Sequence, residues 1–335
     1  MEGGGLRGVL LYVDDGIVVT DAIDVNSRRR RKVSGELPKI IAIVGTNASG
    51  KSAVGLELAK SFGGEIISAD SRQVYRGFDL CSGKITAEEA RAVPHHLIDI
   101  KDIGEAFSVS DFQNMAYSLI PQILQRDKVP FIVGGTGNYV KSVVSGYVLS
   151  GEPVDAALRG KLDKLTADEL LEMLTPEGKA FFASNPSDSR NKRRLIRAIE
   201  KTALGEPLRR ENSARYSALQ IGVTWPKDIL HRRIEERLAS RIELGMIDEV
   251  KTYLDGGGDP ECLYDLGLEY RYILWYLTGK FKSQDEFKLE LARAIKRFAK
   301  RQMTWLRRDE SIIWLDMNGD YMEQARSLTA DFLER

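Results

Sequence analysis

An apolar run that leads into a glycine-rich turn, KIIAIVGTNASGKS at residues 39–52, narrows the possible folds of this chain more than any other feature. The segment matches the pattern G-x-x-x-x-G-K-[ST] without a mismatch from Gly45 to Ser52. In this pattern the glycines let the backbone curl until several N–H groups face one anion at the positive end of the next helix. We therefore predict a phosphate-binding loop formed by Gly45, Thr46, Asn47, Ala48, Ser49, Gly50, Lys51 and Ser52.

Two side chains of this loop carry its expected chemistry. Lys51 should reach over the terminal phosphates, and the hydroxyl of Ser52 should bind a magnesium ion. The alternative is a chance match in a glycine-containing turn. The strand-type run before the loop and the helical apolar spacing at 53–60 favour phosphate binding.

From Ile40 onward strand-type and helix-type segments alternate, which is typical of the α/β class. We predict a P-loop NTPase-like parallel sheet core with helices on both faces. Such sheets bind ligands at the carboxyl ends of their strands, so Asp70, Asp99 and the run 134–136 should surround one crevice. The strands are expected at 40–44, 65–68, 96–98, 130–133 and 221–224, and helices at 51–61, 110–126 and 138–146.

The length of 335 residues predicts either one large domain with an insertion or two domains. The segment 151–214 contains helix-forming runs but no good strand, so we interpret it as a small α-helical insertion. Residues 39–150 and 215–335 are the two parts of the core. In the second part, helices are expected at 227–254, 266–277 and 284–308.

Residues 1–38 differ from the rest of the chain and are interpreted as an N-terminal extension. Two short apolar runs flank Asp14-Asp15-Gly16, so the extension is either a hairpin or a disordered segment. The basic run 28–32 is interpreted as linker, because short basic runs beside a domain edge are commonly solvated.

The net charge is zero, since 49 basic residues balance 49 acidic ones, so any affinity for nucleic acid must come from local clusters. The segments 190–210 and 288–308 each contain eight basic residues. They are either solvated helices or contacts for a phosphate backbone, and together they favour RNA. In the second segment the basic residues lie opposite a predicted core face formed by Phe287, Leu291, Ala294, Ile295, Phe298 and Gln302.

Cysteine and histidine give no sign of a metal site. Cys81 and Cys262 are far apart and too few for a disulfide framework, which points to the reducing cytoplasm. His95 and His96 lack a third ligand, so we expect them to pack and hydrogen-bond. No run is apolar enough for a membrane span, and no signal peptide is evident.

A phosphate loop is shared by kinases, ATPases, GTPases and several transferases, so other residues must discriminate among them. A nucleotide hydrolase is expected to carry an acidic residue at the end of an apolar strand. The run 129–133 ends instead in Gly134-Gly135-Thr136. Asp70 is the well-placed carboxylate, and it suits either a base that deprotonates a nucleophile or a cap or turn residue.

Longer motifs add to this pattern. They are GTNASGKS (45–52), ISADSRQVYRGFDL (67–80), KITAEEARAVPHHLIDI (84–100), FSVSDF (107–112), VPFIVGGTGNYV (129–140), LHRRIEERL with GMIDEV (230–250), LGLEYRYI (266–273) and AKRQMTWLRRD (299–309). In this order they resemble the tRNA dimethylallyltransferases, also called tRNA isopentenyltransferases, over nearly all of residues 39–316.

The resemblance implies transfer of a dimethylallyl group from dimethylallyl diphosphate to N6 of adenine-37, next to the tRNA anticodon. The product is N6-isopentenyladenosine, and the loop holds the diphosphate of the prenyl donor. The implied cofactor is Mg²⁺, bound by Ser52 and Thr136. The implied partners are dimethylallyl diphosphate and the tRNA anticodon stem-loop, and we expect a monomer.

The resemblance also assigns roles to single residues. Asp70 orients the adenine amine and takes its proton, and Thr136 contacts the magnesium or the diphosphate. Arg237 matches the family arginine that pairs with the diphosphate, while Arg233 is its rival for that role. The target base must leave its stack to reach this site. The implied RNA contacts are Ser71, Gln73, Arg190, Arg194, Arg197, Arg301 and Gln302.

The chain departs from the family pattern in three places: Cys81-Ser82-Gly83 replaces a run of Gly-Thr-Ala type, the insertion is short, and the extension is unmatched. Three alternatives remain open. They are an isopentenyltransferase that acts on free AMP, ADP or ATP, a small-molecule P-loop kinase, and a noncatalytic RNA-binding protein.

Overall fold

The computed structural model describes residues 9–13, 16–20, 36–149, 155–184, 188–208 and 212–335. The chain divides into two compact units, Met1–Glu36 and Leu37–Arg335. In the first unit β1 (Val9–Val13) pairs with β2 (Gly16–Thr20) in antiparallel register, as in the hairpin alternative for the extension. The basic run at 28–32 lies outside the described residues.

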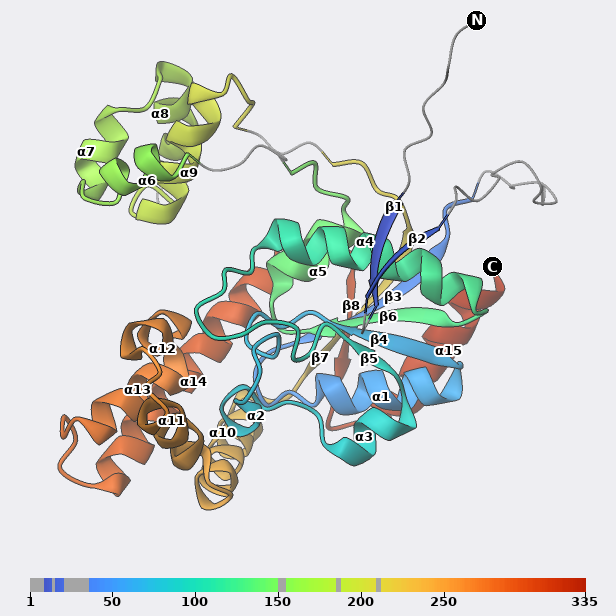
Figure 1. The fold of residues 1–335 in the computed structure, drawn as a ribbon. Coiled ribbons are helices and arrows are strands. Elements are labelled where there is room, and N and C mark those ends of the chain that lie inside the picture. The colour runs from blue at the N-terminus through green and yellow to red at the C-terminus, as the bar shows by residue number, and fades with distance from the viewer. Residues whose placement is uncertain (1–8, 14–15, 21–35, 150–154, 185–187, 209–211) are drawn as a thin grey trace, which may run out of the picture. The chain divides into compact units, whose positions relative to one another are not determined.

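A six-stranded parallel sheet forms the centre of the second unit, with strand order β5-β4-β6-β3-β7-β8 (Figure 1). The strand that leads into the phosphate loop is β3 (Lys39–Gly45), in which Ile41 pairs with Phe131 on one side and Leu219 on the other. The predicted α/β class is therefore confirmed. The other strands are β4 (Gly64–Ser68), β5 (His95–His96), β6 (Val129–Gly134), β7 (Ser217–Thr224) and β8 (Ile312–Asp316).

Helices cover both faces of this sheet because side chains along each strand alternate between its two faces. Ile40 and Val44 of β3 pack with α4 and α5, whereas Ile41 and Ile43 pack with α1 and α15 on the opposite face. Figure 1 shows α4 and α5 on one side of the strands and α1 on the other. These helices are α1 (Lys51–Ser61), α4 (Val109–Gln125), α5 (Gly137–Val144) and α15 (Tyr321–Glu334).

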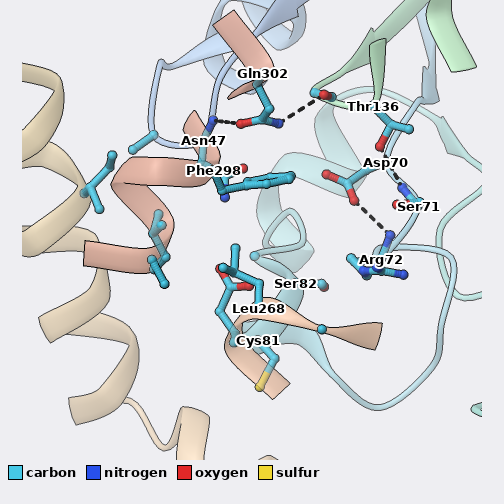
Figure 2. A pocket seen from close by; sticks show the side chains of 18 of the residues that line it. Asn47, Asp70, Ser71, Arg72, Cys81, Ser82, Thr136, Leu268, Phe298 and Gln302 are labelled. Atoms are coloured by element: carbon cyan, nitrogen blue, oxygen red, sulfur yellow. Dashed lines mark hydrogen bonds between the residues drawn. The ribbon is translucent and has the colours of Figure 1, made fainter. Parts of the chain in front are cut away.

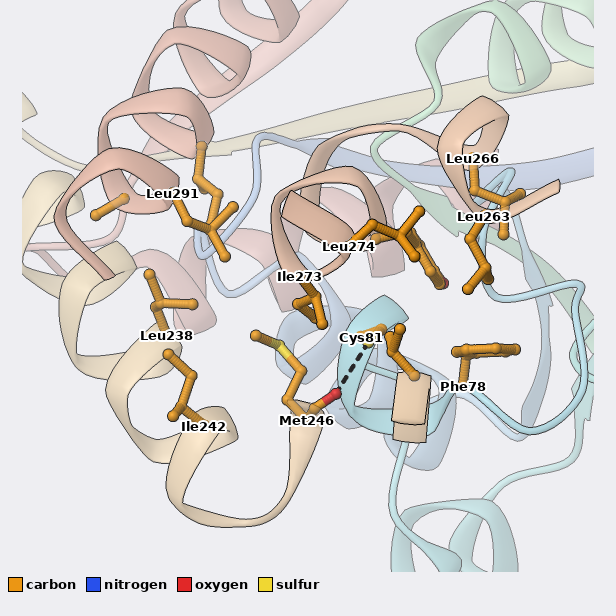
Figure 3. Packing of buried hydrophobic residues seen from close by; sticks show 14 of the residues in the cluster. Phe78, Cys81, Leu238, Ile242, Met246, Leu263, Leu266, Ile273, Leu274 and Leu291 are labelled. Carbon is orange, nitrogen blue, oxygen red and sulfur yellow. Dashed lines mark hydrogen bonds between the residues drawn. The ribbon is translucent and has the colours of Figure 1, made fainter. Parts of the chain in front are cut away.

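A further hydrophobic cluster holds the C-terminal helices against the segment that follows β4 (Figure 3). Phe78 and Cys81 of that segment are buried in it, and Cys81 Sγ donates a hydrogen bond to Met246 O at 3.5 Å. Ala48 of the phosphate loop belongs to the same cluster, so this packing fixes the helices beside the loop. The helices are α2 (Asp79–Ser82), α10 (Lys227–Glu243), α11 (Met246–Asp255), α12 (Pro260–Leu266), α13 (Leu268–Leu277) and α14 (Gln284–Leu306).

Four short helices within the predicted insertion have a hydrophobic cluster of their own, which includes Leu170, Phe182 and Leu195. The carboxylate of Glu200 is buried there and accepts two hydrogen bonds from Arg159, at 2.8 and 2.9 Å. Across the described ranges, no helix combines the length and apolar content needed to cross a membrane. The insertion helices are α6 (Ala156–Leu162), α7 (Ala167–Glu172), α8 (Pro176–Ala183) and α9 (Lys192–Ala203).

Two of the predicted helices were wrong in their bounds because glycines with positive φ interrupt them. The helix expected at 227–254 is divided into α10 and α11 at Gly245, which has φ 102°. The helix expected at 266–277 begins only at Leu268, after Gly267 with φ 77°. Glycine adopts these left-handed conformations without the steric cost that other residues incur.

The strand expected at 96–98 was also wrong, since β5 ends at His96 and the next residue, Leu97, has φ 63°. The short helix α3 (Ala87–Ala92) precedes that strand. Both β8 and α15 follow the last predicted helix and were missed. The strand β8 is short, and only two of its five side chains are buried, so its hydrophobic pattern is weak.

The carboxylate of Glu65 on β4 links this strand to the neighbouring strand β5 and to the end of α4. Glu65 is 5% exposed and accepts hydrogen bonds from Arg126 Nε at 2.9 Å and Arg126 Nη2 at 2.7 Å, at the end of α4. The Nε2 atom of His96, on the neighbouring strand β5, lies 2.7 Å from Glu65 Oε2. Hydrogen bonds from Arg126 hold the pKa of Glu65 below its usual value, against the opposing effect of burial.

We expect Glu65→Gln to lower the free energy of unfolding by about 2 kcal/mol at neutral pH, as for the loss of hydrogen bonds to a charged group. Because the folded pKa of Glu65 is depressed, its contribution is present above the pKa of an unfolded glutamate and is lost as pH falls through the folded value. Urea unfolding of both proteins should therefore give free energies that converge on acidification. Glu57→Gln, in an exposed pair with Lys60, is the control and should change little. Equal stability of wild type and Glu65→Gln at neutral pH would contradict this account.

Candidate active site

A cavity of about 710 Å³ lies at the carboxyl ends of the sheet strands (Figure 2). Its walls include segments that directly follow β3, β4 and β6, together with side chains of α10, α13 and α14. Asp70 and Thr136 line it, as predicted for the crevice, whereas Asp99 does not. The carboxylate of Asp99 accepts a hydrogen bond from Lys84 instead, so the expectation for Asp99 was wrong.

The phosphate-binding loop begins where β3 ends and continues into α1, whose first residue is Lys51. Gly50 has φ 92°, a conformation that favours glycine. At Gly45 an added Cβ would lie 2.4 Å from Ser49 Oγ and 3.0 Å from Val223 O, so Ser49 would have to move to admit a side chain. The two glycines of the motif thus meet two separate local requirements, and the positive end of α1 favours an anion.

Two side chains from the region after β7 donate hydrogen bonds to backbone carbonyl groups of this loop. Trp225 Nε1 donates a hydrogen bond to Ser49 O at 3.0 Å, and Arg233 Nε donates one to Ala48 O at 3.0 Å. The Arg233 guanidinium also lies over the Trp225 ring, 4.8 Å from its centroid. The guanidinium of Arg233 is therefore engaged with the loop backbone and does not line the cavity.

Gln302 of α14 joins the phosphate loop to the segment after β6 (Figure 2). Its Oε1 atom accepts a hydrogen bond from Asn47 N at 2.9 Å, and its Nε2 atom donates one to Gly135 O at 3.0 Å. Both ends of the amide are thus used within the protein. The side chain fixes the spacing between two walls of the cavity.

Lys51 is buried at the base of the cavity, where Nζ donates a hydrogen bond to Thr46 O at 3.4 Å. The pKa of Lys51 is lowered to about 8, mainly by burial; Asp70 opposes this effect, and Arg237 and Arg241 add to it. The ammonium group is therefore charged at neutral pH. An anion that binds beside it would favour the charged form further and raise the pKa of Lys51.

Asp70 follows β4, and Thr136 follows the neighbouring strand β6. Asp70 Oδ1 accepts a hydrogen bond from Arg72 N at 2.9 Å, and Thr136 Oγ1 accepts one from Ser71 N at 3.1 Å. Figure 2 shows both side chains in the same part of the cavity wall. The turn fixes one carboxylate oxygen of Asp70 and leaves Oδ2 without a hydrogen bond to the described residues, on a side chain that lines the cavity.

Two arginines of α10, Arg237 and Arg241, line the cavity one helical turn apart. Arg237 is exposed to solvent through the cavity, but protein atoms surround its guanidinium. Its pKa is lowered to about 10, first by burial and then by Arg241, while Glu269 and Asp70 oppose the decrease. Of the two candidates for the diphosphate, Arg237 lines the cavity and Arg233 does not. The sequence analysis missed Arg241, although its spacing of four residues from Arg237 places both on one helix face.

The residues predicted to contact RNA fall into two groups. Ser71, Gln73, Arg301 and Gln302 line the cavity. Like that of Gln302, the amide of Gln73 is engaged at both ends, since Oε1 accepts from Ser68 Oγ at 2.8 Å and Nε2 donates to Gly83 O at 3.0 Å. These two side chains therefore position loops of the cavity wall.

The other group belongs to the insertion. Arg194 forms an ion pair with Asp188, and Arg197 forms one with Glu200 at 3.2 Å. Arg190 is exposed just before α9.

Aromatic side chains form part of the cavity wall that the sequence analysis did not assign to the site. Phe298 was predicted for the core face of α14, but it is only partly buried and lines the cavity (Figure 2). The guanidinium of Arg301 lies 5.5 Å from the centroid of its ring. Tyr272 and Trp275 of α13 line the same cavity. Arginines interleaved with aromatic rings are a surface on which nucleobases stack.

The donor atoms around the cavity suit Mg²⁺ only in the presence of a phosphate ligand. Ser52 and Thr136 both line the cavity, and within the described ranges no three His, Cys, Asp or Glu side chains form a metal cluster. Mg²⁺ commonly takes one or two protein ligands and completes its shell with water and phosphate oxygens. His95 and His96 form contacts elsewhere, His95 Nδ1 with Val93 O and His96 with Glu65.

Comparison with known proteins identifies the family of this chain. Residues 73–309 match the family model described as IPP transferase. A tRNA dimethylallyltransferase 2 from Shewanella sediminis is 41% identical over 298 residues, which cover 87% of this chain and 98% of that protein. A tRNA dimethylallyltransferase from Carboxydothermus hydrogenoformans is 39% identical over 301 residues, covering 85% of this chain and 94% of that protein.

Solved structures of tRNA-modifying transferases are also similar to this chain. The crystal structure of a tRNA isopentenylpyrophosphate transferase from Bacillus halodurans matches with a TM-score of 0.67 and 36% identity, covering 88% of this chain and 96% of that chain. A eukaryotic dimethylallyltransferase matches in fold, with a TM-score of 0.69 and 23% identity, over 89% of this chain and 80% of that chain. The chain therefore belongs to the IPP transferase family, the family of the tRNA dimethylallyltransferases.

Proposed function

We propose that this protein transfers a dimethylallyl group from dimethylallyl diphosphate to N6 of adenine-37 in tRNA. One observation carries the proposal: a single cavity brings the phosphate-binding loop and Arg237 together with the carboxylate of Asp70. An anion site beside a proton acceptor suits the displacement of a diphosphate by an amine. The relatives named tRNA dimethylallyltransferases support the choice of tRNA over a free nucleotide as the acceptor.

In the proposed reaction, the C–O bond of the allylic diphosphate breaks while a bond forms between adenine N6 and the same carbon. The electron pair of the broken bond leaves with the diphosphate. Lys51, the loop N–H groups and Arg237 bind this anion and stabilise the charge that grows on its oxygens. Mg²⁺, bound by Ser52 and Thr136 with the phosphate oxygens, would add further charge neutralisation.

Asp70 has the role of orienting the amine and accepting the proton that N6 loses. Its Oδ1 atom is fixed by the turn to Arg72 N, which holds the carboxylate in one orientation at the cavity wall. Thr136, through its bond with Ser71 N, fixes the backbone next to Asp70. A base held in this way costs little reorganisation when the amine arrives.

The RNA is proposed to bind at the side of the cavity where α13 and α14 contribute Arg271, Trp275, Arg297 and Arg301. Ser71, Gln73 and Gln302 are proposed to lie near the extruded base, and Arg190, Arg194 and Arg197 to contact the anticodon arm. The protein is proposed to act as a monomer. We propose that this activity takes place in the cytoplasm, together with its tRNA substrate.

Asp70→Asn should reduce the rate of prenyl transfer by about a hundredfold to ten-thousandfold, because the amide cannot accept the proton but can still accept the hydrogen bond from Arg72 N. Transfer of labelled dimethylallyl groups to unmodified tRNA measures this rate. Asp127→Asn is the matched control, since Asp127 is exposed and outside the cavity.

Full activity of Asp70→Asn would refute the role of Asp70 as the base. Two further outcomes would refute the proposed acceptor or donor. Transfer to free AMP as efficient as transfer to tRNA would favour the nucleotide isopentenyltransferase. ATP turnover without any prenyl donor would favour a kinase.

Pyrophosphate binding should weaken as pH rises through about 8, the pKa of Lys51 in the protein without ligand. Below this pH the ammonium is charged before the anion binds, whereas above it binding must take up a proton. Calorimetry in buffers of different ionisation enthalpy measures that uptake. The Lys51→Met variant cannot take up this proton, so the uptake that it still shows is due to the titration of pyrophosphate itself. Identical proton uptake by wild type and Lys51→Met would show that Lys51 does not titrate on binding.

A further inference from the structure

Two guanidinium groups of α10 meet over one glycine. An ideal Cβ built on Gly83 would lie 1.5 Å from Arg241 Nη2 and 2.4 Å from Arg237 Nη2. The two Nη2 atoms are therefore within about 4 Å of each other, a separation at which like charges repel. All three residues line the cavity that contains the phosphate-binding loop.

Neither guanidinium has a partner that would explain this arrangement. Arg237 and Arg241 form no hydrogen bond and no ion pair with any residue in the described ranges. Arg233, on the same helix, does donate a hydrogen bond to a loop carbonyl at 3.0 Å. Arginines that serve only the fold are commonly satisfied in this way. Two adjacent arginines without partners that face a cavity indicate an anionic ligand.

One buried carboxylate compensates part of this charge. Glu269, at the start of α13, is 8% exposed and lines the same cavity. Burial raises the pKa of Glu269 and Arg241 opposes that effect, while Glu269 is the charged group that most favours protonated Arg241. Lys51, Arg237 and Arg241 still outnumber Asp70 and Glu269, so the cavity keeps an excess of positive charge.

We propose that Arg241 is a second guanidinium ligand of the diphosphate, beside Arg237, and that Gly83 is the residue that makes room for it. The proposal rests on the proposed function and adds to it a residue that would contact the leaving group. Two guanidinium groups side by side offer more N–H donors to the diphosphate oxygens than one guanidinium group. The negative charge on these oxygens grows as the C–O bond breaks, so both forks bind more strongly in the transition state.

Gly83 suits this role for two reasons. It ends α2 with φ 64°, and its N–H donates to Asp79 O, a left-handed cap that favours glycine. Its carbonyl accepts the hydrogen bond from Gln73 Nε2, which holds the peptide in place. Any side chain at this position would occupy the space of the Arg241 guanidinium. The departure from the family pattern at 81–83 therefore coincides with the place that Arg241 fills.

The test is calorimetric titration of inorganic pyrophosphate into the full-length protein, which needs neither RNA nor a prenyl group. Arg241→Met should weaken binding by about tenfold to a hundredfold, the range for loss of charged hydrogen bonds. Arg241→Lys keeps the charge but loses the fork, so its loss should be smaller. Arg232→Met is the matched control: Arg232 lies on the same helix, is exposed and does not line the cavity, so binding should stay at the wild-type level.

A role confined to the fold would give a different result. Arg241→Met would then lower the melting temperature but leave the pyrophosphate affinity of the folded protein unchanged, which would overturn the proposal. If Arg241→Met does not fold, the Arg241→Lys titration decides, and an affinity equal to that of the wild type would overturn it. In prenyl transfer, Arg241→Met should lower kcat/KM for the donor without changing KM for tRNA.

Gly83→Ala provides a second, independent variant. Its Cβ should displace Arg241 and crowd Arg237, so pyrophosphate binding should weaken. In the Arg241→Met background the same change should cost less, because one of the two displaced groups is already absent. Equal costs in both backgrounds would contradict the link between Gly83 and Arg241. Failure of prenyl transfer alongside Arg241-dependent pyrophosphate binding would reject the proposed function and leave this inference standing.

Discussion

An excess of positive charge gathered around one cavity is the constraint on which the rest of this structure depends. Lys51, Arg237 and Arg241 line the same walls as the carboxylates of Asp70 and Glu269. Removing such groups from water is costly, and mutual repulsion adds to the cost. The fold must therefore hold these groups rigidly, and a bound anion must complete their compensation. The hydrophobic cluster around Phe78, into which α10, α13 and α14 pack, provides the rigid support.

The phosphate-binding loop depends on parts of the chain that are distant in sequence. Trp225, Arg233 and Gln302 contact it across separations of 176, 185 and 255 residues. Three hydrogen bonds from distant parts of the chain thus fix the loop, and Gln302 also fixes the neighbouring wall at Gly135. Donors that are already in place need no reorganisation when charge develops on the leaving group. The helices after the insertion therefore complete an anion site whose sequence signature lies near the start of the core.

Local patterns explain how far the sequence could predict this site. The phosphate loop and α1, predicted to the residue at 51–61, are encoded by neighbouring residues, and Asp70 is recognisable because it follows a strand. Arg241 and Glu269 carry no such signal, since their meaning depends on which residue they face across the cavity. The amide of Gln302 joins two loops of the protein, and its place in a matching motif did not reveal this second role. Its contact with RNA stays a prediction.

The two carboxylates of the cavity have different environments, and this difference separates their roles. Glu269 is buried next to an arginine, where burial raises its pKa and Arg241 favours its charged form. It can balance charge, but little of its surface is open to a substrate. Asp70 is only partly buried, and the turn to Arg72 N engages one of its oxygens. Asp70 can therefore meet an incoming amine, while Glu269 limits the repulsion between the cations that receive the departing diphosphate.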